Sequence, residues 1–148
     1  KGVKVFVTHG NSMGTLYAVR SAVETPEITK VIINLTYGSL ADNIWSWIVM
    51  RNIKKRLQRA GITKEQVDEI LKPISPIPMA AKLKGKKVLL YLAKNDTLML
   101  YKQSLQFKEA LDKAKVDYVY IENPYFGHNT NMIINNFRSK VYLDFLAN

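Results

Sequence analysis

Gly10-Asn11-Ser12-Met13-Gly14 is the stretch that decides how this chain is interpreted, because a serine stands between two glycines at the spacing G-x-S-x-G. Residues 3–8, rich in valine, predict a buried strand before it, and 13–24 carry apolar residues at helical spacing after it. A strand, tight turn and helix around this motif are typical of a nucleophile elbow, in which the serine backbone is strained. We expect that side chains in place of Gly10 and Gly14 would collide with neighbouring backbone.

The rest of the chain alternates apolar strands with helices. Apolar and β-branched runs predict strands at 28–36, 88–93 and 116–121, and apolar spacing predicts helices at 40–60, 63–71, 101–114 and 131–146. Gly61 is expected to end the helix over 40–60, and the proline-rich stretch 73–78 to form a rigid connector. Continuous apolar strands separated by helices predict an α/β fold with a mostly parallel sheet and flanking helices.

Two of the predicted helices are expected to turn an apolar face inward. For the helix over 40–60 this face comprises Ile44, Ile48, Ile53 and Leu57. The tail helix over 131–146 is expected to cover the sheet with Ile133, Ile134, Phe137, Val141 and Phe145.

Composition bounds the class of protein. A chain of 148 residues, 47% hydrophobic, predicts one globular domain over 1–148. With no cysteine, disulfides, a thiolate nucleophile and Cys-ligated metals are excluded. The apolar runs are too short for a membrane span and no signal peptide is visible, so the compartment stays open with the cytoplasm favoured.

The formal net charge is +10, from 22 Lys and Arg against 12 Asp and Glu. The basic residues fall mostly between Arg51 and Lys115, spread over two helices and a loop, and no nucleic-acid motif accompanies them. We expect solvated helix and loop surface, with contact to an acidic surface as the alternative and no nucleic-acid partner.

A serine hydroxyl is a poor nucleophile at neutral pH and needs a base within hydrogen-bonding reach. The chain has two histidines. His9 precedes Ser12 on the same strand, and we expect a structural role for it. His128 follows the last predicted strand in a loop, at the edge where the carboxyl ends of parallel strands gather. It is the candidate base.

The base in turn needs a carboxylate to orient it. Asp96 comes directly after the strand over 88–93 and is the candidate acid, because it reaches the same edge of the sheet. Asp42, after the second strand, and Glu122, at the end of the fourth, are its rivals. The order Ser12, Asp96, His128 is the chain order of the α/β-hydrolase triad.

On these residues the chain resembles the C-terminal half of an α/β-hydrolase of the esterase or lipase type. The resemblance implies that the earlier strands of that fold precede residue 1, and that 40–85 occupies the place of a lid or cap insert. It implies that the elbow comprises Gly10, Asn11 and Gly14 around Ser12, and that the backbone N–H of Met13 is one oxyanion-hole donor. We expect a fragment, or one chain of an assembly that supplies the rest and pairs the open edge of the first strand.

The predicted function is a serine hydrolase that cleaves an ester, thioester or related acyl bond through an acyl-enzyme, with no metal or organic cofactor. The expected partner is a small acyl substrate with an apolar acyl or alcohol group. The helix that holds Trp45 and Trp47 is open to three interpretations: a surface helix, a lid over the substrate, or a membrane contact, which is not favoured. The alternatives for the whole chain are a non-catalytic binding or interaction domain and, less favoured, a peptidase.

Overall fold

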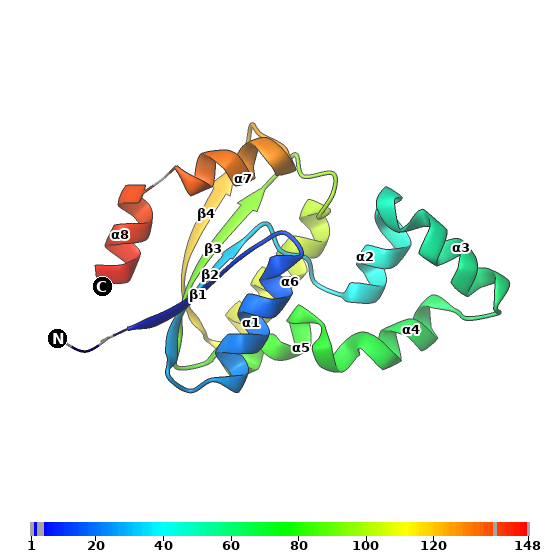
Figure 1. The fold of residues 1–148 in the computed structure, drawn as a ribbon, viewed down its shortest axis with the longest axis horizontal. Helices are drawn as coiled ribbons and strands as arrows, with labels where there is room; N and C mark the ends of the chain where they lie inside the picture. The colour runs from blue at the N-terminus through cyan, green and yellow to red at the C-terminus, as the bar shows by residue number, and fades with distance from the viewer. Residues whose placement is uncertain (1, 3–4, 138, 148) are drawn as a thin grey trace.

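The computed structural model describes residues 2, 5–137 and 139–147. At its centre is one sheet of parallel strands (Figure 1). Its strands lie side by side in sequence order: β1 (Phe6–Asn11), β2 (Ile28–Asn34), β3 (Lys87–Ala93) and β4 (Asp117–Asn123). The predicted parallel α/β class is confirmed. The first strand was expected over 3–8; residues 3 and 4 lie outside the described residues, and β1 extends further, to Asn11.

Helices cover both faces of the sheet. α1 (Gly14–Glu24), α5 (Pro76–Ala80) and α6 (Tyr101–Ala114) pack on one face, and α8 (Ser139–Ala147) packs on the other (Figure 1). Strands that follow one another in a single direction, joined by crossovers of one hand, keep their connecting helices on one face. The opposite face is therefore left for the chain's last helix to cover.

A buried lysine holds α8 against the sheet. The Nζ of Lys30, on β2, donates to the backbone carbonyls of Phe145 at 3.0 Å and Leu146 at 2.6 Å. The last carbonyls of a helix have no partner within the helix and favour a cation. The side chain of Phe145 itself packs against Ile32 and Leu89, so Lys30 and an apolar cluster hold the same end of α8.

The insert between β2 and β3 differs from its predicted form. In place of one helix over 40–60, α2 (Leu40–Ser46) ends before Trp47, a 3-10 turn η1 (Ile48–Met50) follows, and α3 (Arg51–Arg59) continues. Trp47 adopts an extended backbone and packs against the main core, while Ile48 and Ile53 are exposed, so their predicted inward orientation is wrong. Bulky and β-branched residues at 45–49 lower the helix propensity where the break occurs.

The remainder of the insert is also helical. α4 (Lys64–Leu71) begins at the capping box of Thr63 and Gln66, and Gly61 has the left-handed φ of +72° typical of a helix end, as predicted. The predicted rigid connector is instead a 3-10 turn η2 (Lys72–Ile74) followed by α5, which begins at Pro76, where a proline fits because the first helical N–H needs no partner. A third turn, η3 (Ala81–Leu83), leads into β3.

The tail forms two helices rather than one. α7 (His128–Asn136) caps the carboxyl edge of the sheet, and α8 follows it (Figure 1). Ile133 on α7 and Phe137 directly after it are exposed, so the prediction that they cover the sheet is wrong, whereas Phe145 is buried as expected. None of the helices in the described ranges has the length and apolar character needed to span a bilayer.

Candidate active site

Ser12 stands at the turn between β1 and α1, with a φ of +53°. This left-handed conformation is uncommon for a residue with a side chain, and it persists only where the surroundings enforce it. The Ser12 N–H donates to the carbonyl of Asn34 at 2.9 Å, and its own carbonyl accepts from Thr15 N at 3.0 Å and Thr15 Oγ1 at 2.6 Å. The elbow is therefore held from β2 on one side and from the first turn of α1 on the other.

The two glycines of the elbow are not equivalent. A Cβ on Gly10 would lie 2.4 Å from the backbone oxygen of Gly14 and 2.7 Å from Thr15 Cα, which agrees with the predicted collision. A Cβ on Gly14 would meet nothing within 4 Å, so the same prediction is wrong there. Gly10, near the end of β1, lies directly against the first residues of α1, whereas Gly14 is itself the first residue of α1.

Three of the predicted site residues come together in one hydrogen-bonded line. His128, the first residue of α7, places its Nε2 2.9 Å from Ser12 Oγ and its Nδ1 2.7 Å from Asp96 Oδ2. Both His128 and Asp96 are buried. Asp96 Oδ1 accepts from the backbone N–H groups of Leu98 at 2.9 Å and Met99 at 2.8 Å.

These contacts specify the protonation pattern that the line can adopt. Because both backbone groups are donors, Asp96 Oδ1 is fully occupied as an acceptor, and Oδ2 is left to accept from the Nδ1–H of His128. The Nε2 of a neutral His128 is then an acceptor that faces the hydroxyl of Ser12. In this arrangement the hydroxyl proton can pass from Ser12 Oγ to His128 Nε2.

The rival acids are engaged elsewhere. Asp42 forms an ion pair with Lys64 in the insert. Glu122 is hydrogen-bonded by the hydroxyls of Tyr101 and Tyr120 and paired with Lys94 at 3.0 Å. Partial burial acts to raise the pKa of Glu122, but these donors outweigh it and lower the pKa.

The side chain of His9 lies on the face of the sheet that α8 covers, opposite the face that α1 covers. Its ring lies 5.6 Å from that of Tyr142 on α8. Thr8, its neighbour on β1, donates instead to Ala18 of α1, as the alternation of a strand requires. The described residues place no contact between His9 and Ser12.

Two asparagines hold together the loops that carry the acid and the base. Asn95 Nδ2 donates to the carbonyls of Pro124 and Tyr125, each at 3.1 Å. Asn123 Oδ1 accepts from the N–H groups of Tyr125 at 2.9 Å and Phe126 at 3.2 Å. Since Asn95 precedes Asp96 and this loop leads into His128, these bonds fix the spacing of the two groups.

A row of buried amides, which the sequence did not predict, links the serine and histidine elements. Asn34 Nδ2 donates to Asn11 Oδ1 at 2.6 Å, and Asn34 Oδ1 accepts from Asn135 Nδ2 at 2.8 Å. Asn34 and Asn135 are almost fully buried. Asn34 thereby joins the residue before Ser12 to the helix that begins at His128. The sequence does contain one signal for this row: Asn34 ends the apolar run of β2, and buried strands rarely contain an amide side chain.

Replacing Asn34 with leucine should therefore lower the free energy of unfolding by about 2 kcal/mol, because the buried amide of Asn135 and the carbonyl oxygen of Asn11 lose their partner. The midpoint of urea unfolding followed by circular dichroism measures this loss. The same substitution at Asn136, exposed on α7, should shift the midpoint little. Equal midpoints for the two variants would contradict the role assigned to Asn34.

Met13 follows the serine, and none of the hydrogen bonds within the described ranges uses its backbone N–H. The group therefore remains available to a ligand beside Ser12. Across residues 2, 5–137 and 139–147 there is no group of three or more His, Asp or Glu side chains placed to hold a metal ion.

Comparison with known proteins identifies the fold of the chain. No protein-family model and no curated protein sequence matches the chain. Among solved structures, the acylaminoacyl peptidase of Pyrococcus horikoshii aligns with a TM-score of 0.73 and 14% identity over 93% of this chain and 23% of its own. The acetyl xylan esterase of Paenibacillus sp. R4 aligns with a TM-score of 0.74 and 15% identity over 91% of this chain and 43% of its own.

A puromycin-hydrolyzing peptidase of Mycobacterium tuberculosis is also similar, with a TM-score of 0.67 and 19% identity over 83% of this chain and 18% of its own. At these identities the likeness establishes the fold. The chain spans less than half the length of each of these three structures. It has part of the α/β-hydrolase fold: a parallel sheet flanked by helices, as the resemblance implied.

Proposed function

We propose that this chain, which has part of the α/β-hydrolase fold, is a serine hydrolase that cleaves an ester, thioester or related acyl bond. The observation that carries the proposal is the line from Ser12 Oγ through His128 to Asp96, with spacings of 2.9 and 2.7 Å. Distances of this length are what proton transfer from a serine to a base requires. The positive φ of Ser12 adds support, because such strain is typical of a serine presented at an elbow.

The proposed reaction has two steps. Ser12 Oγ attacks the carbonyl carbon while His128 Nε2 takes the hydroxyl proton, and Asp96 stabilises the resulting imidazolium. The tetrahedral intermediate collapses to an acyl-serine when His128 returns the proton to the departing alcohol, thiol or amine. A water molecule, deprotonated by His128, then attacks the acyl-serine, and His128 returns this proton to Ser12 Oγ as the acid leaves.

The backbone N–H of Met13 is the proposed oxyanion donor, since it adjoins Ser12 and makes no hydrogen bond among the described residues. The insert over 40–85 is proposed as a lid or cap, because it follows the carboxyl end of β2, next to the elbow. Exposed aromatic side chains at Tyr125 and Phe126 lie just before His128, and they support an apolar acyl or alcohol group in the substrate.

Esters and peptides are both compatible with the proposed chemistry, since one triad serves either bond. Two of the similar structures carry the name of a peptidase and one that of an esterase. Aryl esters of short and long acyl chains and an acylated peptide anilide are therefore the substrates to compare. A thioester or ester preference is proposed because the leaving group then needs less assistance from His128.

The proposal is tested by covalent labelling with a fluorophosphonate probe, read by intact mass. We expect one adduct on the chain, none on Ser12→Ala, and retained labelling on His9→Ala, because His9 lies on the other side of the sheet. Circular dichroism establishes that each sample is folded. A folded chain that remains unlabelled, or an adduct that persists in Ser12→Ala, would contradict the proposal and favour a non-catalytic binding domain.

A further inference from the structure

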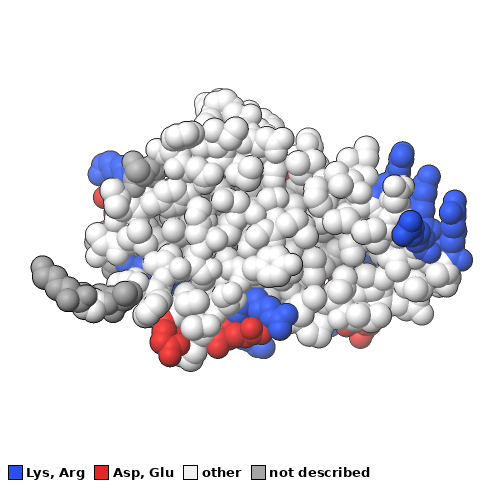
Figure 2. Space-filling model, viewed as in Figure 1, with Lys and Arg blue, Asp and Glu red and all other residues white. Residues whose placement is uncertain are grey.

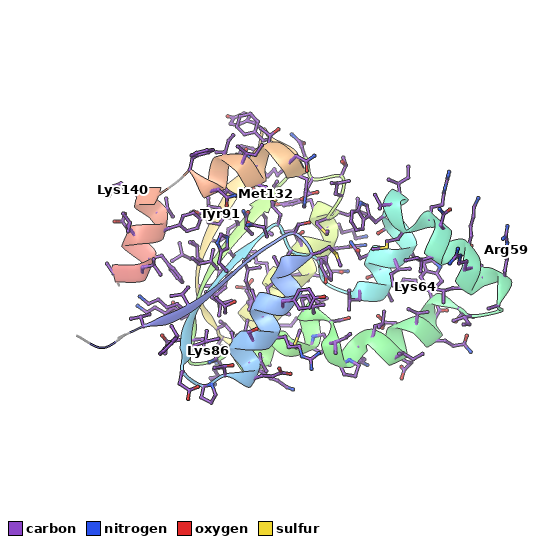
Figure 3. All side chains as sticks on the ribbon, viewed as in Figure 1. Arg59, Lys64, Lys86, Tyr91, Met132 and Lys140 are labelled. Atoms are coloured by element: carbon purple, nitrogen blue, oxygen red, sulfur yellow. The ribbon has the colours of Figure 1, made fainter. Side chains whose placement is uncertain are left out.

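One end of the molecule carries a surface that the proposed chemistry does not use. It is formed by α3 and the η1 turn before it, and we name it the α3 patch: Ile48, Val49, Arg51, Ile53, Lys54, Lys55, Arg56 and Arg59. Figure 2 shows Lys and Arg gathered at the end where Figure 1 places α3, and Arg59 projects away from the body in Figure 3. No residue of α3 is buried.

The charge of the α3 patch is not neutralised by its neighbours. Between Asn43 and Lys64 the sequence contains no Asp or Glu. Within the described ranges, none of the five basic side chains of α3 forms an ion pair; Lys54 Nζ donates to the carbonyl of Trp45 at 3.1 Å. Of the acidic residues on either side of this stretch, Asp42 is paired with Lys64, and Glu65 follows in the first turn of α4.

Aliphatic side chains are exposed beside this charge. Ile48 is 73% exposed, Val49 65% and Ile53 47%. On a helix, residues three and four apart share a face, so the exposed Ile53 and the half-buried Leu57 form an apolar stripe, with Lys54 on one flank and Arg56 on the other. A short helix with an apolar stripe between basic flanks has the pattern of a helix that lies at a membrane surface.

We propose that the α3 patch binds the surface of an anionic lipid bilayer. Basic side chains at the flanks contact acidic headgroups, while Ile48, Val49 and Ile53 enter the boundary of the acyl chains. A second copy of this chain is disfavoured as the occupant, because two patches of the same sign repel. A nucleic acid is disfavoured because a phosphate backbone provides no site for the exposed aliphatic side chains.

The test uses the whole chain and vesicles of phosphatidylcholine with or without phosphatidylserine, measured by sedimentation. We expect binding only with phosphatidylserine, and weaker binding at high salt, because the charge interaction is screened. Trp45, whose carbonyl accepts from Lys54 Nζ, lies next to the α3 patch, so its emission should shift to shorter wavelength on binding, whereas Trp47 packs against the main core and should change little. This readout needs no catalytic activity and is independent of Ser12.

Two variants separate the charge from the aliphatic contribution. Reversing Lys55, Arg56 and Arg59 to glutamate should weaken partition into phosphatidylserine vesicles by roughly 100-fold or more, since each basic residue near an anionic surface contributes about fivefold. Ile48→Ser with Val49→Ser should weaken it by roughly tenfold, by removing the aliphatic side chains that enter the bilayer. All five positions are exposed, so the variants should fold.

The matched control reverses the same number of charges elsewhere, at the exposed Lys82, Lys84 and Lys102. It should retain most of the partition. Equal losses in the two charge-reversed variants, or no binding of the folded chain to phosphatidylserine vesicles, would overturn the proposal. Partition that is insensitive to the Ile48 and Val49 changes but is abolished by competing duplex DNA would overturn it in favour of a nucleic-acid partner.

Discussion

Asp96→Asn should slow the labelling of Ser12 by a fluorophosphonate probe by roughly 10⁴-fold, the loss in kcat that follows this change in a well-studied serine protease. The reason lies in the two oxygens of Asp96. Oδ1 accepts from two backbone N–H groups, those of Leu98 and Met99, so an asparagine must keep its oxygen there. Its NH₂ group then faces His128 Nδ1 and makes that nitrogen an acceptor.

The consequence is a histidine in the wrong tautomer. With Nδ1 an acceptor, the proton of a neutral His128 resides on Nε2, which then points an N–H at Ser12 Oγ and cannot take its proton. The geometry of the site is otherwise unchanged, because aspartate and asparagine have nearly the same shape. We therefore expect the thermal unfolding midpoint to change far less than the rate of labelling.

The controls are the other acids that the sequence offered. Asp42→Asn removes one member of the ion pair with Lys64, and Glu122→Gln alters a carboxylate bonded to Tyr101 and Tyr120. Both should label at close to the rate of the unaltered chain, because neither carboxylate contacts His128. A slow Glu122→Gln variant beside a fast Asp96→Asn variant would reassign the acid and refute the proposed triad.

The three residues of this line could be predicted because their signals are local. Ser12 is marked by its flanking glycines, Asp96 comes just after an apolar strand, and His128 follows the last strand after a short loop. In a parallel sheet the carboxyl ends of all strands meet at one edge, so residues far apart in sequence are brought close by the topology alone. The fold class follows from the same strands and needs no knowledge of side-chain packing.

The parts that could not be predicted depend on tertiary contacts. Asn34 bonds Asn11 because β1 and β2 pair with these two residues opposite each other, a register that the sequence does not state. The break at Trp47 likewise depends on the core that receives its ring. Helical spacing alone places Ile53 and Leu57 on an inward face, but it carries no information on whether anything packs against that face.

Gly10→Ala should lower the free energy of unfolding by about 3 kcal/mol or more. The added methyl would lie 2.4 Å from the backbone oxygen of Gly14 and 2.7 Å from Thr15 Cα. Both are main-chain atoms at the start of α1, so the clash cannot be relieved by a side-chain rotation and must move the helix away from β1. For a domain of this size, that loss corresponds to a fall in Tm of roughly 10 °C.

Gly14→Ala is the matched control, two positions beyond Ser12 in the same motif. A Cβ there meets nothing within 4 Å, and Gly14 opens α1, where alanine is the better helix former. Its Tm should equal or slightly exceed that of the unaltered chain, by thermal unfolding followed with circular dichroism. If both substitutions lower the Tm equally, the elbow requires the conformational freedom of both glycines. If only Gly10→Ala unfolds early, the crossing of β1 beneath α1 is what requires a glycine.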